Sequence, residues 1–164
     1  MTTVDLTAFR NAMASFASGV TVVTTVDEDG TLWGFTASAF SSLSLDPPLI
    51  LVCLEKRADS HPAFERADHF AVSILAEHQQ DTAMRFATRG IDKFGGIETL
   101  QGDATGHPLV PEAMAHIECR IVERLPGGDH TILIGEVLTA RTDDRPPLLH
   151  YNRRFGAFHP HEET

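Results

Sequence analysis

The sequence contains little cysteine and few cations, and each shortage excludes a class of protein. Its only cysteines, Cys53 and Cys119, form no CxxC pair and predict no zinc site. Both lie in apolar runs, where we expect small buried side chains. Thirteen basic against 23 acidic residues give a formal net charge of −10, which argues against a nucleic-acid partner. The cations are nevertheless grouped, so an anionic cofactor is not excluded: Lys56 and Arg57; Arg85, Arg89 and Lys93; Arg153 and Arg154.

Long apolar segments are missing as well. No run approaches the roughly 20 residues of a membrane helix. The first residues, MTTVDLTAFRNAM, lack the basic start and apolar core of a signal peptide. We therefore expect a cytoplasmic protein with no membrane partner. A length of 164 residues, 42% of them hydrophobic, suits one globular domain.

Several common catalytic motifs are absent. There is no GxGxxG dinucleotide fingerprint, no GxxxxGK[ST] phosphate loop and no GxSxG nucleophile elbow. The nine histidines are scattered; only His159 and His161 are close together, in a C-terminal tail that we expect to be solvated. The sequence therefore predicts no metal site.

What is present is a succession of short apolar segments separated by turn residues. Leu6, Phe9, Met13 and Phe16 have the spacing of an amphipathic helix, with Asp5 as its cap. We expect two further helices, one capped by Ser60 and one over 79–89. Strands are predicted over 20–26, 32–38, 49–54, 69–75, 115–125, 130–141 and 154–158.

Two of these assignments concern the middle of the chain. Residues 41–46 are predicted to form a polar loop before Pro47 and Pro48. Residues 49–54, LILVCL, are apolar throughout, so we expect a central strand buried on both faces. The strands mostly follow in hairpin order, which favours a closed or nearly closed antiparallel barrel with short helices over a parallel α/β sheet.

Three segments together resemble the flavin reductase family, whose members have an FMN-binding split-barrel fold. They are the VTVVTT and TASAFSSLSLDPP runs within 20–48, DKF at 92–94, and GDHTILIGEV at 128–137. The similarity runs from about Phe9 to Phe158. It implies a mainly β antiparallel split β-barrel with short helices, as a single domain over 1–164 whose core covers about 9–158. Trp33, and Ala39 in place of a serine, depart from the family's pattern.

The resemblance also implies an activity. Such proteins transfer a hydride from NADH or NADPH to FMN or FAD and supply reduced flavin to a separate monooxygenase. They are homodimers, with the flavin near the subunit interface. Three alternatives stay open: a flavin-binding module without reductase activity, an oxidase of the pyridoxamine-phosphate type, and a barrel without a cofactor.

The candidate flavin site starts at the TASAFSS segment. Thr36, Ala37 and Ser38 would give hydroxyls and small side chains that let a planar ring approach the backbone. Ser41 and Ser42 would donate to phosphate oxygens. The alternative is that these serines only build turns.

Other family positions extend the site. Cys53 and Leu54 would line the isoalloxazine, and Ser60 and His61, at a helix start, would lie near the ribityl chain or phosphate. Positive charge at the phosphate end would come from Lys93 and Arg89. The remaining predicted contacts are Phe94 as a wall of the flavin, and Tyr151 with Arg153 as contacts to the dinucleotide.

His130 is the candidate catalytic residue. In the family's GDH pattern it lies near the nicotinamide, where imidazole can hydrogen-bond the carboxamide or supply a proton. The alternative is an ordinary surface histidine at a strand end.

Overall fold

The computed structural model describes residues 4–162. Its helices are α1 (Leu6–Ala14), α2 (His61–Arg66) and α3 (Gln80–Ala87). The strands are β1 (Ser18–Gly19), β2 (Thr21–Val26), β3 (Leu32–Ala37), β4 (Phe40–Leu45), β5 (Pro48–Glu55), β6 (His69–Ile74), β7 (Leu100–Gln101), β8 (Pro108–Leu109), β9 (Ala115–Gly127), β10 (His130–Thr142), β11 (Leu148–Tyr151) and β12 (Arg154–Ala157). None of the described helices has the length and hydrophobicity of a transmembrane span.

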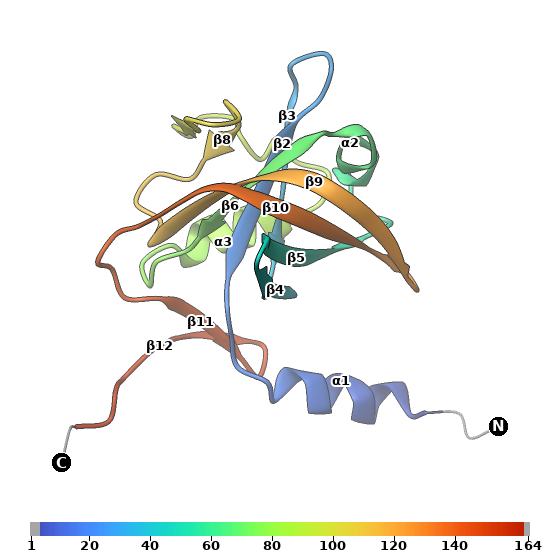
Figure 1. Cartoon of the computed structure of the whole chain (residues 1–164). Coiled ribbons are helices and arrows are strands. Elements are labelled where there is room, and N and C mark those ends of the chain that lie inside the picture. Colours follow the sequence, from blue (N-terminus) through green and yellow to red (C-terminus); the bar gives the residue numbers. More distant parts are fainter. Residues whose placement is uncertain (1–3, 163–164) are drawn as a thin grey trace.

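One seven-stranded antiparallel sheet forms the body of the molecule, in the order β3-β2-β6-β9-β10-β5-β4 (Figure 1). It curls so that β3 comes close to β5, although the two share no ladder. The barrel is therefore open along a seam beside β3. The prediction of a mainly β, antiparallel barrel with short helices is confirmed.

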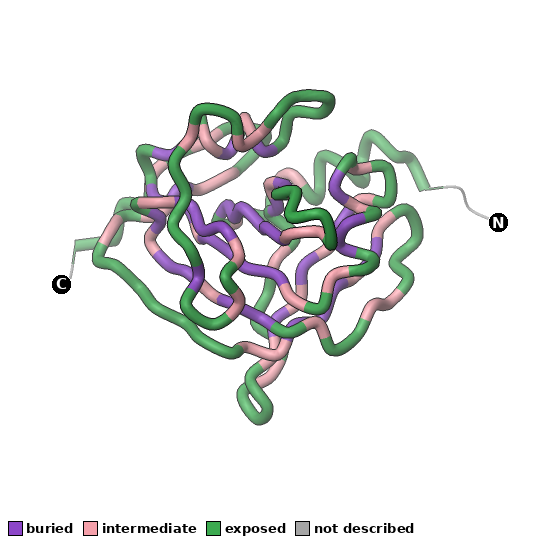
Figure 2. The backbone as a smooth tube through the Cα atoms, turned by 90° about the horizontal axis from the view of Figure 1, so that it is seen from above, coloured by how far each residue is buried: buried purple, intermediate pink, exposed green. Residues whose placement is uncertain are grey.

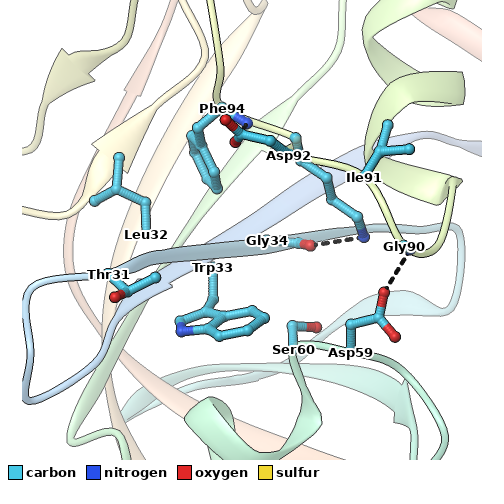
Figure 3. A pocket seen from close by; sticks show the side chains of 11 residues that line it. Thr31, Leu32, Trp33, Gly34, Asp59, Ser60, Gly90, Ile91, Asp92 and Phe94 are labelled. Atoms are coloured by element: carbon cyan, nitrogen blue, oxygen red, sulfur yellow. Dashed lines mark hydrogen bonds between the residues drawn. The ribbon is translucent and has the colours of Figure 1, made fainter.

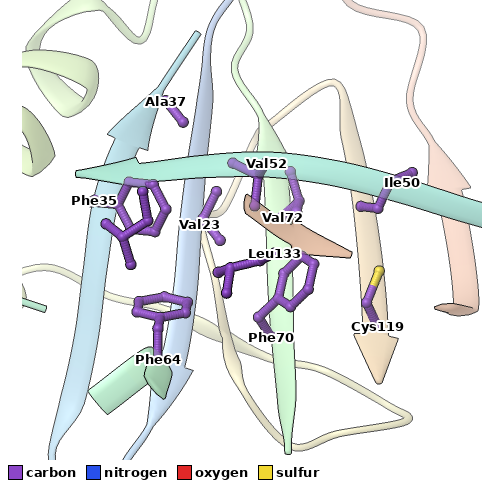
Figure 4. Packing of buried hydrophobic residues seen from close by; sticks show 11 residues of the cluster. Val23, Phe35, Ala37, Ile50, Val52, Phe64, Phe70, Val72, Cys119 and Leu133 are labelled. Carbon is purple, nitrogen blue, oxygen red and sulfur yellow. The ribbon is translucent and has the colours of Figure 1, made fainter. Parts of the chain in front are cut away.

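The core fills the inside of this curled sheet. Strand β2 is almost entirely buried and consists of β-branched residues. Its Val23 belongs to a core cluster with side chains from five other strands and α2 (Figure 4). Gly135 on β10 is required there, because a Cβ at this position would lie 2.6 Å from the ring of Phe70. Figure 2 shows the buried segments gathered at the centre of the molecule.

Two predictions in the middle of the chain were wrong. Residues 40–45 form strand β4 and pair with β5, so the predicted loop at 41–46 is an edge strand. β5 itself lies second from that edge. Only alternate residues of β5 are buried (Ile50, Val52 and Leu54), so it is not covered on both faces. Cys53 is consequently only partly buried, whereas Cys119 is fully buried as predicted.

The N- and C-terminal segments lie outside the barrel. Asp5 caps α1 as predicted, accepting a hydrogen bond from the Thr7 amide at 2.8 Å, yet no residue of α1 is buried. β1, β11 and β12 form a separate small sheet beside α1 (Figure 1). Strand β11 was not predicted. The apolar stripe of α1 thus has no cover within residues 4–162.

Candidate active site

A cleft lies at the open seam of the barrel, between the ends of β3 and β5 and beside α3. Its volume is about 250 Å³, and we refer to it as the main cleft. Eight predicted site residues line it: Thr36, Ala37, Ser38, Cys53, Leu54, Arg89, Lys93 and His130. These residues come from four separate parts of the chain, and the topology brings them to one place.

The free edge of β3 forms one wall. The carbonyl of Gly34 accepts a hydrogen bond from Lys93 Nζ at 3.1 Å, so it points away from β2. In an antiparallel strand both polar groups of a residue face the same side, and every second residue repeats that direction. The backbone amide of Thr36 therefore also faces the seam. The Thr36 hydroxyl is already used, because it donates to the Ala83 carbonyl at 2.6 Å and ties β3 to α3.

Two cations line the main cleft, and both have partners within the protein. Arg89 Nη2 lies 2.5 Å from the carboxylate of Glu55. Lys93 donates to the carbonyls of Phe86 (2.8 Å) and Gly34. Burial lowers the pKa of the Lys93 ammonium, while Asp59 and Arg89 act on it in opposite directions. Arg89 retains several N–H groups and Lys93 retains one, and these can bind an anion.

Cys53 and His130 present their side chains from β5 and β10. Burial raises the pKa of the Cys53 thiol, so this group stays neutral beside any bound ring. His130 Nδ1 lies 2.7 Å from Asp129 Oδ1, and this contact lowers the pKa of Asp129. A carboxylate at Nδ1 places the imidazole proton there, which leaves Nε2 available to a ligand.

A second cavity adjoins the main cleft, and we refer to it as the side cavity (Figure 3). It holds about 380 Å³ and shares Asp59 and Lys93 with the main cleft. Its other lining residues are Thr31, Leu32, Trp33, Gly34, Ser60, Gly90, Ile91, Asp92 and Phe94. Of the predicted site residues, Ser60 and Phe94 therefore lie here and not in the main cleft. Ser60 stands at the N-cap of α2, but its side chain makes no capping hydrogen bond.

The loop that closes the side cavity is held by α3 and by its own carboxylates. Arg85 donates to the carbonyls of Lys93 (2.7 Å), Asp92 (3.1 Å) and Gly95. Asp92 Oδ1 accepts from the amides of Phe94 (3.1 Å) and Gly95 (2.9 Å). The cavity wall is thus built before any ligand arrives.

A third hollow is an apolar groove beside α1. It is lined by Phe9, Arg10, Met13, Ala14, Phe16, Ser18, Ser38, Ala39, Phe40, Ser41, Leu51, Cys53, His150 and Arg153. Two more predicted site residues, Ser41 and Arg153, lie here. Arg153 donates to Asn11 Oδ1 at 2.8 Å, which anchors α1 to the turn after β11.

Three predicted residues line none of these hollows. His61 turns its Nε2 toward Thr131 Oγ1 at 2.9 Å and Glu65 at 3.3 Å. Ser42 is exposed on β4, and Tyr151 is exposed at the end of β11. Because neighbouring strand residues point to opposite faces, Ser41 and Ser42 cannot both face the groove.

Sequence reasoning missed Glu55 and Asp59, the two carboxylates that line the main cleft. Glu55 is the last residue of β5, and Asp59 lies in the turn that follows; both positions are typical of turn-forming residues. Their position between two predicted site residues, Cys53 and Ser60, could have indicated that they belong to the site. Among residues 4–162, no group of three or more His, Cys, Asp or Glu side chains is arranged to hold a metal ion.

Comparison with known proteins gives matches along nearly the whole chain. A family model described as "Flavin reductase like domain" matches residues 13–159. The actinorhodin polyketide dimerase of Streptomyces coelicolor is 45% identical, with 93% of this chain and 86% of the relative covered. The reductase component of 4-nitrophenol 4-monooxygenase/4-nitrocatechol 2-monooxygenase of Rhodococcus opacus is 42% identical, covering 98% of this chain and 85% of the relative. An NADH:riboflavin 5'-phosphate oxidoreductase of Streptomyces pristinaespiralis is 45% identical over 90% of this chain and 85% of its own length.

The fold also matches solved structures. The NADH:FAD oxidoreductase SgcE6 of Streptomyces globisporus C-1027, in complex with NAD and FAD fragments, superposes with a TM-score of 0.91. It is 38% identical, and the match covers 99% of this chain and 100% of that chain. The predicted resemblance is therefore confirmed.

Proposed function

Because this chain belongs to the flavin reductase-like family, we propose that it transfers a hydride from NADH to a flavin and supplies reduced flavin to a separate monooxygenase. One observation carries the proposal: the main cleft assembles residues from all three family-like segments, Ala37 and Ser38 from the first, Lys93 from the second and His130 from the third. The relatives named as NADH:flavin oxidoreductases and monooxygenase reductase components support it.

The cleft residues fit a flavin. Ala37 and Ser38 have small side chains, so a planar ring can approach the free edge of β3. Leu54 supplies apolar surface, and the backbone amide of Thr36 can donate to ring acceptors. When bound, the flavin supplies the redox chemistry by accepting the hydride. The protein then needs only to bind, orient and exclude water, which agrees with a cleft that contains no catalytic triad.

The charged groups and the imidazole of the cleft have separate proposed roles. We assign Arg89 and Lys93 to the phosphate end, where their remaining N–H groups would bind phosphate oxygens. We assign His130 to the nicotinamide: Nε2 would hydrogen-bond the carboxamide or hold a proton, while Asp129 fixes the ring through Nδ1. We retain Ser60 and Phe94 as contacts to the distal part of the flavin.

We further propose a homodimer in which a second copy covers the groove beside α1. Phe9 and Met13 of α1 and Phe16 just after it are 54%, 55% and 74% exposed, which leaves an apolar patch on the surface. The groove shares Ser38, Ala39 and Cys53 with the main cleft, so the second copy would border the flavin.

In such a dimer, residues outside the main cleft gain a role. Ser41 and Arg153 line the groove and would contact ligand near the subunit interface. Tyr151 is exposed at the end of β11 and keeps its assignment to the dinucleotide. We keep Ser42 as a contact to phosphate and His61 as a contact to the ribityl chain or phosphate. Both contacts require that dimer formation or ligand binding bring these side chains to the ligand. The cytoplasm, where NADH and a monooxygenase partner would both be available, is the compartment that we propose.

A steady-state assay tests the reductase proposal. Purified protein is mixed with NADH or NADPH and with riboflavin, FMN or FAD, and oxidation of the nicotinamide is followed by absorbance. The proposal expects NADH oxidation that depends on both enzyme and added flavin. Flavin binding without nicotinamide oxidation would instead indicate a flavin-binding module.

A further inference from the structure

Cations and carboxylates are unevenly distributed along the two adjoining hollows. Arg89 lies in the main cleft, Lys93 lies on the boundary shared with the side cavity, and Asp92 lies in the side cavity alone. Glu55 and Asp59 also line the main cleft, and Asp59 shares the boundary with Lys93. A ligand that extends into the side cavity would therefore pass both cations, Arg89 and Lys93, and would then meet Asp92 without a further cation. Phosphate suits the boundary, and a neutral polar group suits the side cavity.

The carboxylates of the side cavity still have accepting capacity. Asp59 Oδ2 accepts from the Gly90 amide at 2.8 Å, and Asp92 Oδ1 accepts from two amides. Neither second carboxylate oxygen has a hydrogen bond from residues 4–162. An acidic side chain that accepts from a ribose hydroxyl is a recurring element of dinucleotide sites. The same carboxylates would repel a phosphate placed among them.

The side cavity also offers a fixed aromatic surface. Trp33 is the only tryptophan of the chain. Its indole N–H donates to Asp27 Oδ2 at 2.8 Å, which sets the position of the ring. In Figure 3 the indole lies beside Gly34, which has no side chain, and on the same side as Ser60 and Asp59. Such a surface is suited to stacking a base.

Ser60 adds an independent sign of a ligand. It lines the side cavity, the residue is 1% exposed, and its Oγ has no hydrogen-bond partner within the described chain. Leaving a buried polar atom without a partner is unfavourable, and such atoms are rare in folded proteins. A hydroxyl or ring nitrogen of a bound ligand would provide the missing partner.

From these observations we infer that the side cavity binds the adenosine half of FAD, and that FAD is therefore preferred to FMN. The inference rests on the function proposed above, because it takes the main cleft as the site of the flavin ring. The diphosphate would lie at Lys93, the ribose at Asp59 and the adenine against Trp33. A volume of about 380 Å³ is adequate for a small-molecule site, for which roughly 300–1,000 Å³ is typical.

Equilibrium binding without NADH tests the inference separately from catalysis. Dissociation constants for FAD and FMN are measured by flavin fluorescence for the wild type, Trp33→Leu, Trp33→Phe and Ser60→Ala. We expect the wild type to bind FAD at least about tenfold tighter than FMN, the size expected for one stacked base. Trp33→Leu should remove most of this ratio, Trp33→Phe should keep most of it, and Ser60→Ala should reduce it. Adenosine, which lacks a phosphate, should compete with FAD and leave FMN binding unaffected.

The control is Phe158→Leu, which changes an exposed aromatic residue outside the three hollows and should keep the wild-type ratio. Equal affinity of the wild type for FAD and FMN would overturn the inference, even if the enzyme reduces both flavins with NADH. An equal loss of FAD and FMN affinity in Trp33→Leu would also overturn the inference, because it would show that Trp33 supports the structure of the flavin site and does not stack on adenine. A raised KM for NADH in Trp33→Leu with an unchanged FAD-to-FMN ratio would assign the cavity to NADH instead. Failure of the wild type to oxidise NADH would contradict only the proposed function.

Discussion

The carboxylate of Glu55 lies 2.5 Å from the guanidinium of Arg89 within the main cleft. This pair places an anion beside one of the two cations that we assign to flavin phosphate. A phosphate that approaches Arg89 must therefore compete with Glu55. Both side chains are about half exposed, so the competition is screened by water and its effect is modest.

This relationship predicts opposite effects for two substitutions. Glu55→Gln should strengthen FMN binding by about two- to fivefold, since it removes the competing charge, and Arg89→Gln should weaken FMN binding. Riboflavin, which lacks the phosphate, is the matched control ligand and should respond to neither change. Titration of both ligands by fluorescence quenching checks this. A parallel change in riboflavin affinity would show that the pair shapes the ring site and does not act on phosphate.

The apolar face of α1 leads to a prediction about assembly. Phe9→Glu combined with Phe16→Glu should convert a dimer into a monomer, because each substitution places a charge in the surface that we assign to the interface. Leu45→Glu is the control, since Leu45 is 95% exposed and lies at the β4–β5 turn. Sedimentation velocity at micromolar concentration measures the outcome. A wild-type monomer, or a double variant that stays dimeric, would contradict this assignment.

Glu118 leads to a prediction about acid stability. Its buried carboxylate accepts from the Thr105 amide and hydroxyl, both at 2.7 Å, and from the Ala104 amide and Thr139 hydroxyl. Burial alone would raise the pKa of Glu118, but these hydrogen bonds outweigh it and lower the pKa. A lowered folded-state pKa means stability that is present above the ordinary Glu range and is lost as pH falls through the lowered value.

We therefore expect Glu118→Gln to be destabilised by about 1–3 kcal/mol at neutral pH, and to lose less stability than the wild type on acidification below about pH 4.5. Urea unfolding at a series of pH values measures both effects. Glu98→Gln is the control carboxylate, on the exposed loop of the α3–β7 connection. If the wild type and Glu118→Gln showed parallel acid profiles, Glu118 would not be the group that titrates.

Gly135 leads to a prediction about packing. Gly135→Ala should destabilise the fold by about 1–3 kcal/mol, because the added Cβ would press on the Phe70 ring and the Cys119 Cβ. Gly156→Ala is the control, since a Cβ there meets no atom within 4 Å. Thermal unfolding of both variants gives the comparison. Equal stability of the two variants would show that Phe70 moves aside without cost.

The sequence predicts the fold where local pattern and burial agree. Strand β2 is β-branched and buried except at Val26, so propensity and environment indicate the same structure. The prediction of a loop over 41–46 was wrong because an edge strand needs only one covered face, and the exposed serines of this strand resemble those of a loop. The spacing in α1 predicted the helix, but nothing in a single sequence states which surface covers its apolar stripe.

The candidate site, like the fold, could be predicted only in part. The residues of β3, β5 and the start of β10 were predicted from family-like segments, and the sheet order brings them to one cleft. His61 was predicted from its place at a helix start, yet its ring turns toward Thr131, a contact across 70 residues. Pairings of this kind are set by tertiary packing. For the same reason the ion pair of Glu55 with Arg89 could not be inferred from the sequence.

Anaerobic stopped-flow absorbance of flavin bound to the enzyme, mixed with NADH, tests the central claim most directly. The account predicts that the wild type bleaches the flavin in a single turnover. His130→Ala should do so ten- to a thousandfold more slowly at unchanged flavin affinity, and the exposed His78→Ala should match the wild type. If NADH left the flavin oxidised in the wild type, the chain would not be a reductase. A normal rate in His130→Ala would remove His130 from the nicotinamide site.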